Sequence, residues 1–126
     1  MRANTTVVTS SGANSGIPYQ FYNYTLTEEN VYVYNRYSQL YKIISRANTL
    51  FAHLGDVSYA APSARDTYEA EARFLRALAY YWLVTEWGDV PLVLKALESA
   101  EEVRANNYRR PKAEVYQAIF DDLKYV

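Results

Sequence analysis

Hydrophobic side chains recur at helical spacing in three segments of the chain. In residues 28–54 they advance in steps of three and four, which is the pattern of one face of a long helix. The members of this stripe are Val33, Tyr37, Leu40, Tyr41, Ile44, Ala47, Phe51 and Leu54. We expect Thr27 to cap the helix and Gly55 to end it.

The same spacing predicts a second helix over residues 64–87. Ser63 and Asp66 form a variant of the capping box at its start, and Gly88 suits the left-handed position that ends many helices. Several large and small apolar residues are expected to face a neighbouring antiparallel helix. They are Phe74, Leu75, Leu78, Tyr81 and Trp82 with Ala70 and Ala77.

A third helix is predicted over residues 111–125. Before it, the run DVPLVL after Gly88 is expected to be extended because Pro91 disfavours a helix, and a loop should continue to Arg110. Pro111 suits the first helical position. The apolar stripe of this helix comprises Val115, Tyr116, Ile119, Phe120 and Leu123. Because this stripe has nothing after it to cover both its sides, we expect the fold to be incomplete.

Residues 1–27 lack helical periodicity and are rich in Ser, Thr, Asn and Gly before a tyrosine-rich stretch. We interpret them as an irregular arm. Together with the three helices this predicts an all-α fold of antiparallel helices, with residues 1–27 as the arm and residues 28–126 as one helical region.

Composition narrows the function classes. The 126 residues carry 13 Lys and Arg against 14 Asp and Glu, so there is no positive field to attract nucleic acid. Fourteen tyrosines are the main anomaly, and the chain has no cysteine and no apolar run long enough to span a membrane. Any export signal is expected to lie outside this sequence.

Catalytic signals are poor, and we expect no enzyme, no metal and no cofactor. His53 is the only histidine, stands at a predicted helix end, and has no recognisable nucleophile partner. Asp121 and Asp122 are adjacent, so on a helix they point about 100° apart and do not form a carboxylate pair. The pairs Arg65–Glu69 and Glu69–Arg73 have helical spacing and are interpreted as solvated surface pairs.

Three runs resemble the N-terminal half of the SusD/RagB family. They are RANTLFAHL, EARFLRALAYYWLVTEWGDVPLV and RRPKAEVYQAIFDDLKYV, and the resemblance covers about residues 30–126. The junction from helix to GDVPLV is the most specific part. Within EARFLRA, Glu71 and Arg76 are expected to have a structural role between helices.

The resemblance implies tetratricopeptide-like helix pairs and a non-catalytic, glycan-binding surface lipoprotein. It implies oligosaccharide and a SusC-like TonB-dependent outer-membrane transporter as partners. It also implies a location at the cell outer membrane through a lipidated cysteine upstream of this sequence, and a large C-terminal half after it.

Glycan binding needs flat aromatic faces beside hydrogen-bonding groups. The arm offers this mixture in Tyr19, Tyr22 and Tyr24 next to Gln20 and Asn23, although the same rings could pack on the helices. The second helix holds another aromatic group, Tyr80, Tyr81, Trp82 and Trp87, whose spacing favours core packing over a sugar platform. The alternative function is a helical-repeat scaffold that binds protein without sugar.

Overall fold

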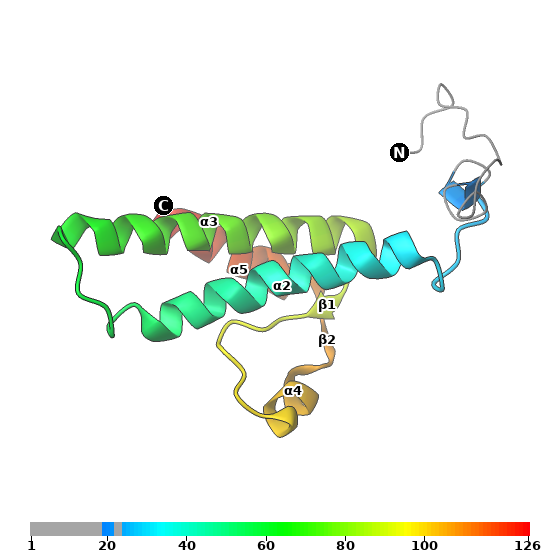
Figure 1. Ribbon diagram of the computed structural model, residues 1–126. Helices are drawn as coiled ribbons and strands as arrows, with labels where there is room; N and C mark the ends of the chain where they lie inside the picture. The colour runs from blue at the N-terminus through cyan, green and yellow to red at the C-terminus, as the bar shows by residue number, and fades with distance from the viewer. Residues whose placement is uncertain (1–18, 22–23) are drawn as a thin grey trace. The chain divides into compact units, whose positions relative to one another are not determined.

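The computed structural model describes residues 19–21 and 24–126, and it is predominantly helical (Figure 1). With the labels of Figure 1, its long helices are α2 (Val31–His53), α3 (Pro62–Trp87) and α5 (Lys112–Tyr125). The chain divides into two compact units, Met1–Ser38 and Gln39–Val126. In the second unit α2 and α3 run in opposite directions, which confirms the predicted all-α fold with antiparallel helices.

The first unit contains the predicted arm and the start of α2. Residues 19–21 are helical, whereas an irregular conformation was expected. Asn30, rather than the expected Thr27, caps α2, because its Oδ1 accepts a hydrogen bond from the Tyr32 amide at 2.9 Å. The helix therefore begins at Val31.

Helix α3 begins at Pro62, two residues earlier than expected. Ala61 is the N-cap residue, and no side chain makes a capping hydrogen bond there. The predicted capping role of Ser63 is therefore wrong. Proline at the first position needs no such partner, since its missing N–H is one of the unpaired groups at any helix start. At the other end Gly88 has φ 74°, and its amide donates to the Val84 carbonyl at 3.0 Å.

The segment between α3 and α5 is more ordered than the expected loop. Two short strands, β1 (Val90–Pro91) and β2 (Arg109–Arg110), pair antiparallel with Val90 opposite Arg110. Between them lies the short helix α4 (Ala100–Asn106). Ser99 caps α4 by accepting a hydrogen bond from the Glu102 amide at 3.1 Å, and the local sequence SAEE contains this signal.

The start of α5 is held by the strand segment. Pro111 is its N-cap rather than its first residue. The Asp89 carboxylate accepts a hydrogen bond from the Lys112 amide at 2.9 Å, so it satisfies one of the unpaired donors of the first turn. The sequence GDVP therefore joins the end of α3 to the beginning of α5.

The core of the second unit lies between α2, α3, β1 and α5. Its buried apolar residues are Leu40, Ile44, Ala47, Leu54, Ala72, Ala77, Ala79, Tyr80, Leu83, Val84, Val90, Val115, Ala118 and Ile119. The predicted stripes of α2 and α5 are thus partly confirmed. The predicted contact face of α3 is wrong for its large members, because Phe74, Leu75, Leu78, Tyr81 and Trp82 are exposed.

The described helices include none with the length and apolar character required to cross a bilayer.

Candidate functional site

A buried cluster of charged and polar side chains joins the three long helices of the second unit. At its centre Asp122 of α5 accepts two hydrogen bonds from Arg76 of α3, both at 2.7 Å. Arg73, one helical turn away, donates a third to Asp122 at 3.1 Å. Asp122 is only 2% exposed and Arg76 is 6% exposed, so this pair is removed from water. It confirms the structural role expected for Arg76.

The same guanidinium connects α3 to α2 and to the strand segment. Arg76 donates to Asn48 Oδ1 at 2.6 Å and to the Leu94 carbonyl at 3.1 Å. Asn48 in turn donates to the Val93 and Lys95 carbonyls at 2.9 and 3.1 Å. Because every buried side-chain nitrogen and oxygen atom among the described residues has a hydrogen-bond partner, the side chains of the cluster are fully satisfied.

Glu69 extends the cluster toward the end of the bundle. It receives two hydrogen bonds from Arg73, at 3.0 and 2.8 Å, and an ion pair from Arg65 at 3.4 Å. Glu69 is buried, which corrects the interpretation of these pairs as solvated. Burial by itself raises the pKa of Glu69, but the hydrogen bonds from Arg73 and Tyr125 and the nearby positive charges outweigh it and lower the pKa below 4.5.

Two aromatic rings cover the guanidinium groups. The centre of the Phe51 ring lies 4.7 Å from Cζ of Arg76 and 5.2 Å from Cζ of Arg73. The centre of the Tyr125 ring lies 4.2 Å from Cζ of Arg73. Such stacking lets a planar cation keep its hydrogen bonds in the ring plane while its face contacts carbon. The cluster is therefore built for packing, with no exposed reactive group.

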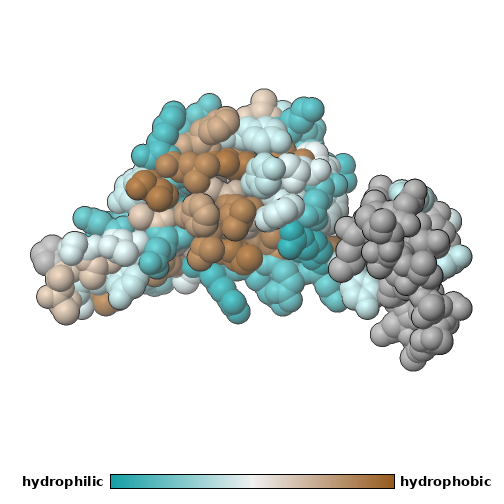
Figure 2. Space-filling view, turned by 90° about the horizontal axis from the view of Figure 1, so that it is seen from above, coloured by the Kyte–Doolittle hydropathy of each residue, from teal (hydrophilic) through white to brown (hydrophobic). Residues whose placement is uncertain are grey.

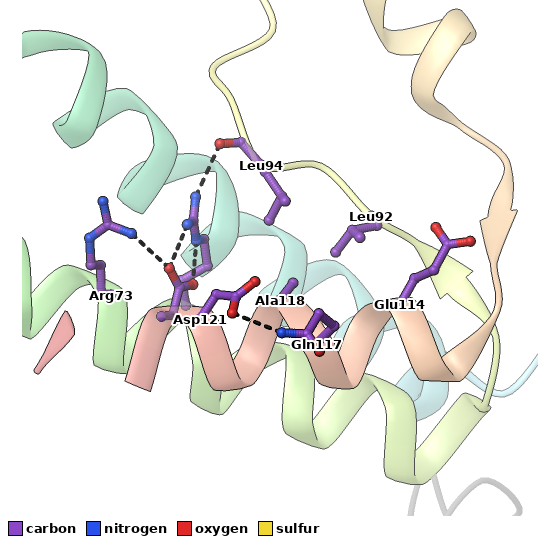
Figure 3. A pocket seen from close by; sticks show the side chains of 9 residues that line it. Arg73, Leu92, Leu94, Glu114, Gln117, Ala118 and Asp121 are labelled. Carbon is purple, nitrogen blue, oxygen red and sulfur yellow. Dashed lines mark hydrogen bonds and ion pairs between the residues drawn. The ribbon is translucent and has the colours of Figure 1, made fainter. Parts of the chain in front are cut away.

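An open cleft of about 350 Å³ adjoins this cluster (Figure 3). Leu92, Leu94 and Ala118 supply apolar wall, and Gln117 and Asp121 of α5 lie beside them. The Gln117 amide donates to Asp121 at 2.8 Å. The wall nearest the cluster consists of Arg73, Arg76 and Asp122, whose polar atoms already pair with one another. Glu114 of α5 also lines the cleft, and its carboxylate accepts a hydrogen bond from Arg110 at 3.3 Å.

The GDVPLV junction is fixed from both sides. Tyr80 of α3 is fully buried, and its hydroxyl both donates to the Val93 carbonyl at 2.8 Å and accepts from the Val93 amide at 2.7 Å. Tyr41 of α2 donates to the Pro91 carbonyl at 2.7 Å. Tyrosines of two helices thus hold this extended run in place.

The aromatic group of α3 divides into buried and exposed members. Tyr80 is core, as expected, and Trp87 is half-buried. Tyr81 and Trp82 are 46% and 41% exposed and form an edge-to-face pair with ring centres 5.7 Å apart. The expectation that these two rings are core is therefore wrong.

In the arm, the structure describes three of the five predicted glycan-contacting residues. Tyr19 and Tyr24 are exposed, at 40% and 60%. Gln20 is half-buried and its Oε1 accepts a hydrogen bond from Asn30 Nδ2 at 2.8 Å. Tyr22 and Asn23 lie outside the described residues.

The backbone of Tyr24 is unusual. Its φ of 60° makes it the one non-glycine residue with positive φ among those the structure describes. A bulky side chain rarely adopts this conformation, and such strain is concentrated at binding and catalytic sites.

The residues weighed for catalysis are separated. His53 is exposed and contacts Asp56 at 2.8 Å, Asp121 is exposed, and Asp122 is buried in the cluster. Glu71 is also exposed, so of the two EARFLRA residues only Arg76 joins the helices. Across residues 19–21 and 24–126, no group of three acidic, histidine or cysteine side chains could hold a metal ion.

Comparison with known proteins identifies the family. A family model for SusD-like proteins, described as "Starch-binding associating with outer membrane", matches residues 2–125. The chain therefore belongs to the SusD-like family, as its sequence runs indicated. Among curated relatives, SusD-like protein P2 of Formosa agariphila is 34% identical over 103 residues, which are 82% of this chain and 20% of the relative.

Solved structures agree with this assignment. A SusD superfamily protein from Parabacteroides distasonis has 27% identity and a TM-score of 0.76 over 93% of this chain and 24% of that chain. A laminarin-binding SusD-like protein has 29% identity and a TM-score of 0.77 over 92% of this chain and 24% of its own. The chain thus spans about a quarter of the solved relatives, and its helix pair is the tetratricopeptide-like arrangement expected from the resemblance.

The buried cluster was the main feature that the sequence did not predict. Asp122 pairs with Arg76 across 46 positions of sequence, and no local spacing connects them. One signal was present, because Asp122 lies one helical turn after the buried Ala118 and Ile119 and so shares their face of α5, where a carboxylate needs a buried partner.

Proposed function

We propose that this chain is part of a non-catalytic glycan-capture protein of the bacterial outer membrane, which binds oligosaccharide and delivers it to a SusC-like TonB-dependent transporter. The observation that carries the proposal is the family match over residues 2–125. Two solved relatives support the ligand class: one is described as laminarin binding, and another, with a TM-score of 0.65 and 29% identity, was solved with xylogluco-oligosaccharide.

The proposed attachment follows from the family rather than from this chain. SusD-like proteins associate with the outer membrane. Surface exposure, and anchoring through a lipidated cysteine upstream of these residues, are part of the proposal. The chain itself has no cysteine.

For the sugar contacts we propose the arm residues Tyr19, Tyr22 and Tyr24, with Gln20 and Asn23. The exposed rings of Tyr19 and Tyr24 and the strained backbone of Tyr24 support this site. A ring that stacks on sugar is exposed in the free protein, so its loss leaves no cavity.

The test replaces Tyr19, Tyr22 and Tyr24 together with Ala in the gene product that contains this sequence. Affinity electrophoresis in gels containing laminarin or xyloglucan should show loss of retardation, while helical circular dichroism and Tm stay close to wild type. A matched control replaces three exposed tyrosines outside the arm, Tyr32, Tyr34 and Tyr68, which should leave retardation intact.

Two results would contradict the site. Undiminished retardation of the arm variant would place the sugar contacts elsewhere. Loss of the fold together with binding would show that the arm rings are buried packing residues, since truncating a buried aromatic ring to Ala costs about 3 to 5 kcal/mol of stability.

The alternative function is a helical scaffold that binds protein without sugar. The exposed apolar side chains of α3 favour it. Co-purification with the transporter and no retardation by any soluble glycan would decide for this alternative.

A further inference from the structure

The segment that joins α4 to α5 is strongly positive. Residues 103–113 hold four of the 13 lysines and arginines of the chain and none of its 14 acidic residues. The four cations are Arg104 in the last turn of α4, Arg109 and Arg110 on β2, and Lys112 at the start of α5. The whole chain has a net charge of −1, so this positive charge is a local feature. We call residues 103–113 the basic segment.

Three of the four cations have no acidic partner. Arg110 pairs with Glu114, with 3.3 Å between Nη1 and Oε2. For Arg104, Arg109 and Lys112, no carboxylate of the described residues lies at ion-pair distance. All three residues are exposed. Exposed cations without counter-charges attract anions within about one Debye length, which is about 8 Å at physiological salt.

The basic segment also carries an exposed aromatic ring. Tyr108 is 49% exposed, and Cζ of Arg110 lies 4.7 Å from the centre of its ring. This contact holds the ring beside a guanidinium group. Asn107, the residue before it, is exposed and adds an amide. An aromatic face with neighbouring amide and charged groups is the mixture that binds sugar.

The basic segment lies away from the exposed apolar surface. Helix α4 has no buried residue, and Figure 1 shows it below α3 and α5, joined to α5 through β2. Figure 2 shows the surface seen from above, where hydrophobic side chains gather. Helix α4 therefore lies on the other side of the second unit, where the surrounding surface is polar and charged.

We propose that the basic segment binds oligosaccharide that carries carboxylate or sulfate groups. Tyr108 stacks on a sugar ring. The three unpaired cations bind the anionic substituents, because guanidinium and ammonium groups form charge-assisted hydrogen bonds with such oxygens. Side chains alternate along a strand, so Arg109 and Arg110 lie on opposite sides of β2 and meet successive units of an extended ligand. The proposal rests on the proposed glycan capture for its ligand class and adds a contact region separate in sequence from the arm.

The test measures binding to the gene product that contains this sequence by isothermal titration calorimetry. The probes are an oligogalacturonate, a sulfated carrageenan oligosaccharide, a neutral laminarin oligosaccharide and poly-glutamate. One variant combines Arg109→Gln with Lys112→Gln. The matched control combines Arg46→Gln with Lys42→Gln on α2, where both residues are exposed and also have no acidic partner among the described residues. Both variants therefore lose one arginine and one lysine.

The wild-type gene product should bind at least one of the two anionic oligosaccharides, and the one it prefers distinguishes carboxylate from sulfate. The variant of the basic segment should bind that sugar at least about tenfold more weakly, because hydrogen bonds to charged groups are lost. The α2 variant should change this affinity less than about twofold, since its charges lie outside the site. Neither variant should alter binding of the neutral laminarin oligosaccharide.

Tyr108→Ala separates ring stacking from charge. It should weaken binding of the anionic sugar by about threefold or more and leave Tm unchanged, because a half-exposed ring that stacks on a ligand leaves no cavity when it is removed. Unchanged affinity in this variant would overturn the stacking role of the ring.

Equal losses in the two double variants would overturn the proposal. Binding of poly-glutamate as tightly as the anionic sugars would also overturn it, because the basic segment would then recognise an acidic protein surface by charge alone. Binding of laminarin without either anionic oligosaccharide would overturn this inference and leave the proposed function intact. No binding of any of the sugars would overturn both.

Discussion

At the scale of single residues, the neighbours Asp121 and Asp122 have opposite environments. Asp121 is exposed. It accepts a hydrogen bond from Gln117 and pairs with Lys124, both on its own helix. Asp122 is buried and accepts hydrogen bonds from Arg76 and Arg73 of α3. One step of about 100° around α5 separates a surface carboxylate from the centre of the buried cluster.

Asp122→Asn should therefore be strongly destabilising. It leaves the buried Arg76 without its counter-charge, and breaking one side of a buried pair costs about 3 to 5 kcal/mol. Asp121→Asn makes the same chemical change one position away and should stay within about 0.5 kcal/mol of wild type. Urea unfolding of the two variants measures the difference, and similar midpoints for both would contradict the role assigned to Asp122.

At the scale of elements, the end of α3 depends on one backbone conformation. Gly88 has φ 74° and ψ −121°, which lies outside the left-handed helical region expected for it but still has positive φ. No heavy atom lies within 4 Å of an added Cβ, so a larger residue there is limited by the backbone and not by space. The turn into GDVPLV begins at this residue.

Gly88→Ala should cost about 1 to 2 kcal/mol, because an L-residue disfavours this conformation. Gly55→Ala is the matched control: that position also has open space around it and lacks positive φ. It should be neutral or slightly stabilising, since alanine reduces the entropy of the unfolded chain. Thermal melts of both variants provide the measurement, and equal costs would show that the backbone of Gly88 is not limiting.

At the scale of the whole molecule, the buried cluster couples stability to pH. The pKa of Glu69 is lowered in the folded protein, so its carboxylate stabilises the fold at pH values above about 4.5, its ordinary value. That contribution disappears as the pH falls through the lowered pKa. Acid should therefore loosen the contact between α3 and the end of α5.

Glu69→Gln should be less stable than wild type at pH 7 and should lose less additional stability on acidification. The two unfolding free energies should converge once the pH has fallen through the lowered pKa of Glu69, because the folded wild type then also carries an uncharged side chain at position 69. Glu71→Gln, an exposed neighbour on the same helix, should follow the wild-type curve throughout. Denaturant unfolding at a series of pH values tests this, and parallel curves for wild type and Glu69→Gln would contradict it.

Local patterns in the sequence determined much of the architecture. Stripes of apolar residues located the three long helices because helical periodicity is visible within each segment. Gly88 and the following Val90–Pro91 predicted the turn after α3, because glycine adopts positive φ and proline disfavours a helix. The Ser99–Glu102 cap of α4 was equally local and could have predicted that helix.

Only the tertiary structure decided which side of α3 is buried. From Phe74 to Thr85 this helix is apolar on nearly its whole circumference, so periodicity could not distinguish the side of Tyr80 from that of Leu78. The burial of Glu69 and Asp122 likewise depends on partners brought together by folding, across 46 positions in the case of Arg76 and Asp122. The sequence by itself determined the three long helices and the family, because both depend on local pattern. The buried faces and the charged cluster were decided by tertiary structure, because both depend on which helices meet.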